Sequence, residues 1–195
     1  MSYDLLYEEV QKRGGRIGTN WLKELAVKFS DFIHIHEQWS GAINQMGLRG
    51  FFLEGAFNGP PLIGEHEALI VLSRQMVKGP DGANWRRLVF TKELMHVFDT
   101  PEEKADSGDK LDLQAEKFRN PSIPTSPQYL AEQKAVWRAL GALCPEADRL
   151  TYKAAIEAKT MSYAVLGTTV GIPERYAIEL MKPDFVERVM GPTRG

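Results

Sequence analysis

Apolar side chains recur at steps of three and four residues from position 19 to position 46, and this spacing predicts one amphipathic helix over 19–46. Gly47 follows the last apolar position and is a typical helix stop. Two short apolar segments, 48–54 and 68–72, come next and predict two strands. The Asn-Gly-Pro-Pro segment at 58–61 favours a turn between them, because Gly accepts positive φ and Pro cannot donate a ladder hydrogen bond.

The rest of the chain is predicted to be helical apart from one acidic loop. A turn at 79–82 precedes a helix over about 84–98. The acidic segment 100–112 has almost no apolar residues, so we expect a solvated loop with at most one helical turn. Ser before Pro at 126–127 is a good helix start, and that helix is expected to end at Pro145. Further helices are expected at 146–161, 162–169 and 173–181.

The order of helix, short sheet and then helices is typical of an α+β domain with a helical C-terminal portion. For 195 residues we expect a domain over 1–145 and a helix-turn-helix-like extension over 146–195, packed on the first part. Hydrophobic residues make up 43% and charged residues 26% of the chain, as in ordinary soluble proteins. No apolar run reaches the roughly 18 residues of a membrane span, and residues 1–16 contain no signal-peptide core. We therefore expect a cytoplasmic protein with no membrane partner.

Few histidines and cysteines are available for metal binding or nucleophilic chemistry. The single cysteine, Cys144, excludes an internal disulfide and a cysteine-cluster zinc site, and it is predicted to be a small buried side chain without an activated thiolate. His34 and His36 form an H-x-H pair, which chelates well on a strand, but on the predicted helix they point about 200° apart and cannot share one ion. His36 is expected to pack in the core and His66 to lie at the surface. A histidine-based site is then predicted to depend on His96.

Residues 92–96 read Lys-Glu-Leu-Met-His, and this segment carries the most informative chemical signal of the chain. In the zinc-peptidase pattern H-E-x-x-H, two histidines four residues apart share one helix face and bind the metal, and the glutamate is the general base for the metal-bound water. Glu93 and His96 occupy the glutamate and second histidine positions, while Lys92 stands at the first histidine. The E-x-x-H spacing alone is common on helix surfaces, so its meaning depends on a second segment.

That second segment is 131–145. It resembles the third-ligand helix of the ImmA/IrrE-type metallopeptidases, which reads roughly E-x-x-A-N-x-F-A-x-x-L-L-M-P. Glu132 matches the ligand glutamate and Pro145 the closing proline, and the family's R-F-T-L-A-H-E-L-G-H is similar to 87–96. The resemblance covers roughly 19–145. It implies a zincin-like fold, with a small β-sheet packed on helices, and a zinc peptidase whose usual partner is a helix-turn-helix repressor.

Four departures from the family pattern lie in these two segments. A protonated lysine has no lone pair to donate and brings a positive charge to the place of Zn²⁺, so Lys92 removes one of three protein ligands. Loss of a ligand should cost more than the roughly 10 to 100-fold typical of second-shell changes, so we expect no tight catalytic zinc and no other cofactor. The Lys92 ammonium is expected to bridge towards Glu132 or Glu93 and to take the electrostatic place of the metal. The other departures are Thr91, Met95 and Lys134.

These inferences predict a catalytically degenerate metallopeptidase-like regulatory protein of bacterial or phage type, which binds a protein partner such as a transcriptional repressor. Two alternatives stay open. One is an active zinc metallo-endopeptidase in which Glu93 is the base and His96, Glu132 and a further ligand hold the metal. The other is a DNA-binding regulator that acts through the helix pair 162–181. Basic and acidic residues nearly balance in the C-terminal part, and the whole chain has a net charge of −2. Because DNA binding needs cations that contact phosphates, this balance favours a packing or protein-contact role for the helix pair.

Overall fold

The computed structural model describes residues 2–43, 49–55, 64–78, 81–104 and 126–191. These residues form helices and one small mixed sheet, so the predicted α+β class is confirmed. No helix among them is long and apolar enough to cross a membrane. The predicted turn at 58–61 and most of the acidic loop lie outside the described residues.

The long helix predicted over 19–46 is wrong beyond residue 29. Helix α2 (Thr19–Phe29) ends there, and strand β1 (His34–Ser40) follows it. Ile35 is fully buried and lies between two more exposed histidines, which is the alternation of a strand with one covered face. The error arose because apolar residues continue at three- and four-residue steps beyond Phe29, at Phe32 and Ile33 and then at Trp39 and Ile43, although the helix has ended.

The two predicted strands are confirmed, and β1 extends their sheet. β2 (Gly50–Glu54) pairs antiparallel with β3 (Glu67–Ser73), and β1 pairs with the other edge of β3 in parallel, giving the order β1-β3-β2. Ile70 and Leu72 of the central strand are fully buried. The register places the start of β1, the end of β2 and the start of β3 at the same end of the sheet.

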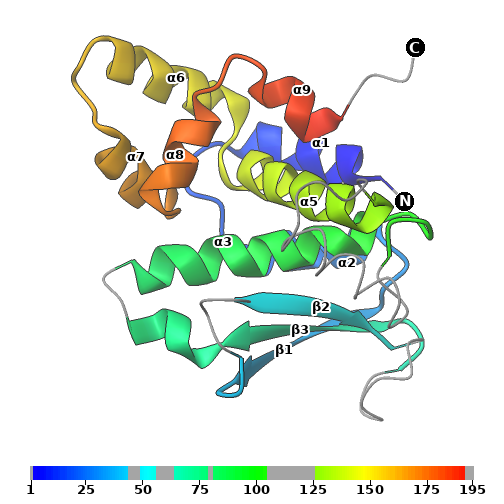
Figure 1. Cartoon of the computed structure of the whole chain (residues 1–195). Coiled ribbons are helices and arrows are strands. Elements are labelled where there is room, and N and C mark those ends of the chain that lie inside the picture. The colour runs from blue at the N-terminus through cyan, green and yellow to red at the C-terminus, as the bar shows by residue number, and fades with distance from the viewer. Residues whose placement is uncertain (1, 44–48, 56–63, 79–80, 105–125, 192–195) are drawn as a thin grey trace.

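Helix α3 (Gly82–Leu94) lies across one face of this sheet, as Figure 1 shows. It continues through a short 3₁₀ turn, η2 (Met95–Phe98), so the helix predicted over 84–98 is confirmed except that its last turn is tighter. A second 3₁₀ turn, η1 (Arg74–Lys78), connects β3 towards α3. Residues 101–103 form a turn at the start of the acidic loop.

Two helices from distant parts of the chain form the next layer. α1 (Tyr3–Arg13) and α5 (Pro127–Leu143) contact each other, and α5 also packs on α3. The Ser126 hydroxyl caps α5 by accepting a hydrogen bond from the Tyr129 backbone N–H at 3.2 Å, as the Ser-Pro start predicted. The Tyr3 hydroxyl of α1 donates to the Arg138 carbonyl of α5 at 2.9 Å.

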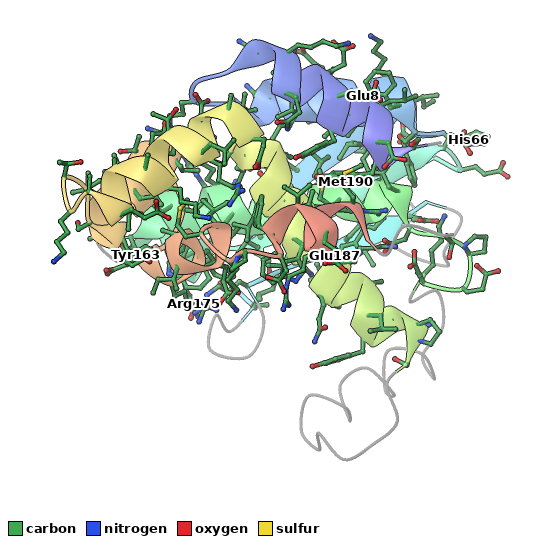
Figure 2. All side chains as sticks on the ribbon, turned by 90° about the horizontal axis from the view of Figure 1, so that it is seen from above. Glu8, His66, Tyr163, Arg175, Glu187 and Met190 are labelled. Carbon is green, nitrogen blue, oxygen red and sulfur yellow. The ribbon has the colours of Figure 1, made fainter. Side chains whose placement is uncertain are left out.

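The predicted helical C-terminal part is present and packs on α5. Trp137 of α5 contacts Phe185 of the last helix, with ring centroids 6.2 Å apart, and Figure 2 shows that helix across α5. The buried core is continuous from α1 to the last helix, without a break at residue 145. The helices are α6 (Glu146–Glu157), α7 (Tyr163–Val170), α8 (Glu174–Leu180) and α9 (Phe185–Met190), of which α9 was not predicted.

Candidate functional site

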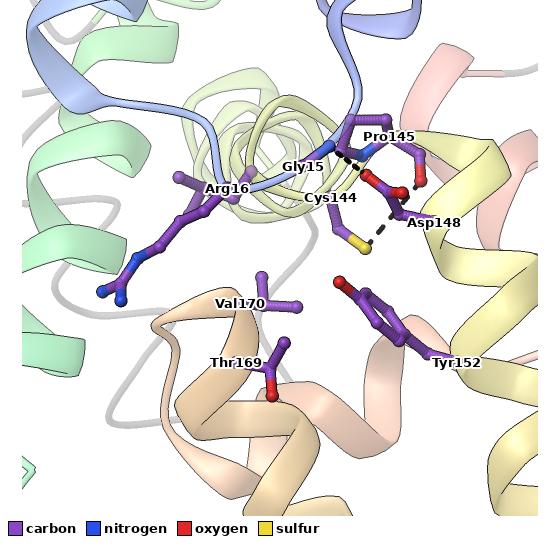
Figure 3. A pocket seen from close by; sticks show the side chains of 9 residues that line it. Gly15, Arg16, Cys144, Pro145, Asp148, Tyr152, Thr169 and Val170 are labelled. Atoms are coloured by element: carbon purple, nitrogen blue, oxygen red, sulfur yellow. Dashed lines mark hydrogen bonds between the residues drawn. The ribbon is translucent and has the colours of Figure 1, made fainter.

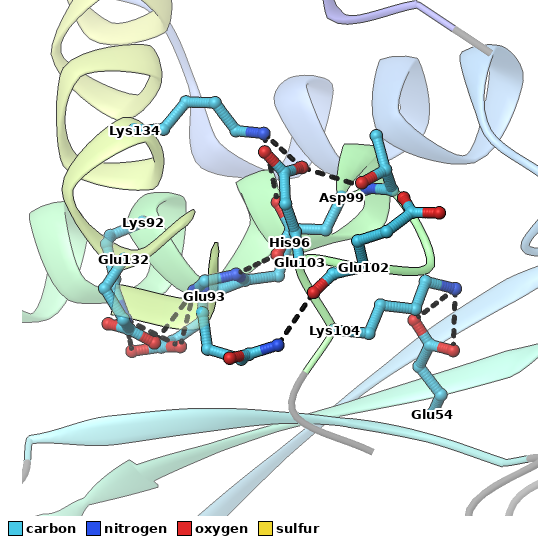
Figure 4. A network of polar contacts seen from close by, with 12 residues as sticks. Glu54, Lys92, Glu93, His96, Asp99, Glu102, Glu103, Lys104, Glu132 and Lys134 are labelled. Atoms are coloured by element: carbon cyan, nitrogen blue, oxygen red, sulfur yellow. Dashed lines mark hydrogen bonds and ion pairs between the residues drawn. The ribbon is translucent and has the colours of Figure 1, made fainter. Parts of the chain in front are cut away.

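The four residues of the predicted site come together where α3 ends. Lys92 and Glu93 lie in the last turn of α3, His96 lies in η2, and Glu132 lies in the second turn of α5. Ala135 is a small buried side chain one turn further along α5, which lets α5 approach α3 closely. Figure 4 shows the four functional side chains turned towards one another.

Lys92 lies at the centre of this cluster. Its Nζ is 3.1 Å from Oε1 and 3.3 Å from Oε2 of Glu93, and it forms a second ion pair with Oε2 of Glu132. The Lys92 side chain is 14% exposed and the Glu93 side chain 4%, so little water screens the contact. The bridge predicted from Lys92 is therefore present, and it reaches both glutamates.

His96 is held by an aspartate that the sequence analysis did not identify. Its Nδ1 lies 2.6 Å from Oδ2 of Asp99. A carboxylate on one ring nitrogen fixes the tautomer and directs the other nitrogen, as in many histidine metal ligands. His96 Nε2 has no hydrogen-bond partner among the described residues, and it lies 3.4 Å from Oε1 of Glu132 and 3.8 Å from Oε2 of Glu93. The three-residue spacing from His96 to Asp99 was the signal that could have indicated this contact.

Burial and neighbouring charges act in opposite directions on the pKa values of the cluster. Burial would lower the pKa of Lys92, but the charges of Glu93 and Glu132 raise it above its usual range, so the ammonium stays protonated. Burial raises the pKa of Glu93, although Lys92 acts against this. Burial and the Lys92 charge would lower the pKa of His96, but the Asp99 hydrogen bond and the Glu132 charge outweigh them and raise it. The charged state of each group thus depends on its neighbours.

Asp99 connects the cluster to further ion pairs, which Figure 4 shows. Its Oδ1 lies 3.9 Å from Nζ of Lys134, and Lys134 pairs with Glu103. Burial would raise the pKa of Glu103, but the hydrogen bond from Lys134 lowers it below its ordinary value. Lys104 Nζ lies 2.8 Å from Oε1 of Glu54 at the end of β2. Lys134, which stands at the family's asparagine position, thus belongs to a network of charges around the site.

The cluster does not fit a zinc ion as it stands. Zinc needs lone pairs at about 2.0–2.3 Å from the metal. The position between Glu93 and Glu132 holds an ammonium, which has no lone pair to offer. No three His, Cys, Asp or Glu side chains of the described residues are placed to hold one metal ion. The present arrangement of the cluster supports ion pairing and hydrogen bonding.

A cleft of about 500 Å³ opens beside Asp99, at the end of the sheet where β1 begins and β2 ends. Four carboxylates line it, those of Asp31, Glu54, Glu65 and Asp99, against one lysine, Lys104, and one histidine. The excess of carboxylates makes the cleft acidic and favours a cationic ligand. This cleft was not predictable from the sequence, because its walls come from segments far apart in the chain.

The prediction that His34 and His36 point apart is wrong because the two residues lie on a strand. Residues two apart on a strand share a face, and the two ring centroids are 4.3 Å apart. The prediction of a core position for His36 is also wrong, since its side chain is 37% exposed and its Nε2 lies 3.1 Å from Oε2 of Glu67. His66 is exposed, as predicted, and Figure 2 shows it at the periphery of the molecule.

Cys144 is buried, as predicted. Only 2% of the residue is exposed, and burial raises the pKa of its thiol to about 12. Figure 3 shows the thiol beside a cavity of about 10 Å³, which has room for about one water molecule. A thiol with so high a pKa is almost entirely protonated at neutral pH, which disfavours a nucleophilic role.

The helix pair predicted at 162–181 is present as α7 and α8. Gly171 ends α7 with φ of 80°, a left-handed conformation that glycine adopts without strain. Arg175 of α8 lies over the rings of Trp85 and Tyr176, with its Cζ 4.5 Å and 4.7 Å from the two centroids. Figure 2 shows Arg175 at the opposite end of the molecule from His66. DNA binding by this pair stays a prediction.

Comparisons of the chain with models of protein families, with curated proteins and with solved structures found no match. The resemblance to ImmA/IrrE-type metallopeptidases therefore rests on the residues of the two sequence segments alone.

Proposed function

We propose that this chain is a catalytically inactive, metallopeptidase-like protein that acts by binding a protein partner. The observation that supports the proposal most directly is the position of Lys92 between Glu93 and Glu132. Both oxygens of Glu93, the candidate general base, lie within 3.3 Å of this ammonium. The ammonium lies where a water molecule would have to approach this carboxylate, so Glu93 is poorly placed to act as a general base.

The surroundings of Lys92 support the idea that a metal centre has been lost. His96 keeps a carboxylate on Nδ1 and directs Nε2 towards Glu93 and Glu132, as a zinc-ligating histidine does. With histidine at position 92, the chain would carry the full H-E-x-x-H pattern and the glutamate of α5. We therefore expect one substitution, Lys92→His, to create a zinc site.

Zinc uptake by the full chain tests the catalytic part of the proposal. We expect Lys92→His to bind one equivalent of Zn²⁺ more than the wild type in calorimetric titrations after chelator treatment, and the double variant with His96→Gln to lose that additional equivalent. We expect the wild type to bind no zinc that depends on His96. The active-peptidase alternative would be established instead by two results together. The wild type would bind zinc that His96→Gln loses, and it would cleave casein, an activity that Glu93→Gln abolishes.

The acidic cleft supports the binding part of the proposal. Asp31, Glu54, Glu65 and Asp99 line it, and the cleft is large enough for side chains of a partner segment. A helix-turn-helix repressor, the partner class that the resemblance implies, carries Lys and Arg side chains for DNA phosphates. Complementary charge would guide such a partner to the cleft and increase its association rate.

Charge reversal in the cleft tests the binding part. With a purified helix-turn-helix repressor as the probe, we expect Glu65→Lys to weaken binding by about tenfold or more, and high salt to weaken it further. Glu157→Lys is the matched control, because Glu157 is also exposed and is the last residue of α6, which Figure 1 shows on the other side of α3 from the sheet. If Glu65→Lys and Glu157→Lys lost the same affinity for the repressor, the attraction would depend on overall charge, and binding at the cleft would be contradicted. Absence of binding by the wild type would remove the partner proposal and leave the zinc result intact.

A further inference from the structure

Strand β1 brings two histidines and a glutamate together on the sheet face opposite the helices. Ile35 points into the core, so its neighbours His34 and His36 point the other way. Their ring centroids are 4.3 Å apart. Glu67 of β3 is the register partner of His34, and its Oε2 lies 3.1 Å from Nε2 of His36. Three side chains that commonly bind metals are thus adjacent on two neighbouring strands.

Glu67 and His34 keep atoms that could bind a metal ion, in addition to the His36–Glu67 contact. The Gly64 N–H donates to Oε2 of Glu67 at 2.9 Å, and this hydrogen bond together with His36 lowers the pKa of the carboxyl. Within the described part of the chain, Oε1 of Glu67 and both ring nitrogens of His34 have no hydrogen-bond partner. The His36 and Glu67 side chains are 37% and 27% exposed, so a metal ion can reach them from solvent.

We propose that His34, His36 and Glu67 form a binding site for a first-row divalent transition-metal ion, with Zn²⁺ as the probe. Imidazole and carboxylate are ligands of zinc, nickel and copper. In a tetrahedral zinc site with bonds of about 2.0–2.2 Å, neighbouring ligand atoms are roughly 3.3–3.5 Å apart. The 3.1 Å between His36 Nε2 and Glu67 Oε2 is close to that separation.

One side chain must move for the site to close. As they stand, the three side chains do not surround a common point. His34 is the exposed member, so its ring can turn towards the His36–Glu67 pair without displacing buried side chains. Water supplies the fourth ligand, as at other open zinc sites. This site is independent of the Lys92 cluster, which lies on the helix side of the sheet.

Zinc titration of the full-length, tag-free chain tests the proposal. We expect the wild type to bind one equivalent of Zn²⁺ at neutral pH. His34→Gln and His36→Gln should each weaken that binding by more than about tenfold, because each removes a metal ligand and not merely a residue that hydrogen-bonds to a ligand. His66→Gln is the matched control, because His66 is exposed near the same strand end and is not in the cluster. If zinc binding is lost in His36→Gln but retained in His96→Gln, the zinc occupies the site at His34, His36 and Glu67 and not the cluster around Lys92.

A second measurement does not depend on how well the variants fold. Addition of Ni²⁺ to the wild type should broaden the NMR signals of the His34 and His36 rings before those of His66 and His96. No zinc uptake by the wild type, or uptake that persists in His36→Gln, would overturn the proposal. Nickel broadening that affects His66 first would do the same.

Discussion

Replacement of Lys92 by Met removes the positive charge at the centre of the cluster and keeps a side chain of similar length. Loss of one partner of a fully buried ion pair costs about 3–5 kcal/mol, because a charge is left uncompensated. Two carboxylates lose their partner here, but the side chains of Lys92 and Glu132 are 14% and 25% exposed, and water screens part of the repulsion. We therefore expect Lys92→Met to lower the free energy of unfolding by about 2–4 kcal/mol at neutral pH.

The loss should depend on pH in a defined direction. Burial already raises the pKa of Glu93 above its ordinary value of 4.5, and without Lys92 it should rise further. A carboxyl whose pKa is higher in the folded state binds its proton more tightly there, so stability falls as pH rises from the unfolded-state pKa through the folded-state pKa. We therefore expect the cost of Lys92→Met to be smaller at pH 5 than at pH 8, in urea unfolding followed by tryptophan fluorescence.

Two further variants separate the ion pair from other effects. The double variant Lys92→Met/Glu93→Gln also removes the more deeply buried of the two carboxylate charges and leaves only that of the more exposed Glu132, so it should recover at least half of the lost stability. Lys12→Met is the matched control, because Lys12 pairs with Glu9 at the surface with side chains 66% and 36% exposed, and no measurable change is expected. The reasoning would be refuted if Lys92→Met lost no more stability than Lys12→Met, or if the double variant were no more stable than Lys92→Met.

Two other substitutions test the surroundings of the site. The pKa of Glu103 is lowered in the folded state by Lys134, so their pair stabilises above pH 4.5 and this contribution is lost as pH falls through the folded-state pKa. We expect Glu103→Gln to cost about 1 kcal/mol or less at pH 7 and less than that at pH 3 in urea unfolding, and an equal cost at both pH values would contradict this. A Cβ on Gly141 would lie 2.6 Å from Val189 Cγ1, so Gly141→Ala should cost about 1–3 kcal/mol in thermal unfolding, whereas Gly41→Ala, with no atom within 4 Å, should cost far less.

Local signals made part of the fold predictable. The strands at β2 and β3 were predictable because short apolar segments were separated by turn residues, and the start of α5 because Ser126 and Pro127 favour the first turn of a helix. The end of α2 was not, because Phe32, Ile33 and Trp39 continue the helical spacing beyond Phe29 and only pairing with β3 identifies the strand that follows. α9 was missed because six residues give too few positions to show a period.

The candidate site was predictable where helix geometry or the resemblance applied. Lys92, Glu93 and His96 lie within one helical turn, so their proximity followed from spacing. The position of Glu132 beside them depended on packing of α5 on α3, and only the resemblance indicated it. Asp99 was missed because its contact with His96 depends on a 3₁₀ turn, whose tighter geometry the apolar pattern does not report.

The contact of α1 with α5 has a consequence for biosynthesis. The hydrogen bonds from the Tyr3 hydroxyl to Arg138 and from the Glu146 N–H to Gln11 each join residues 135 positions apart. At a synthesis rate of about 5–20 residues per second, α1 leaves the ribosome roughly 7–27 seconds before its partner. During that time the apolar face of α1, including Leu6, lacks α5 and has α2 as its neighbour in the first layer to be made. The layer above α3 therefore closes only after α5 has been made.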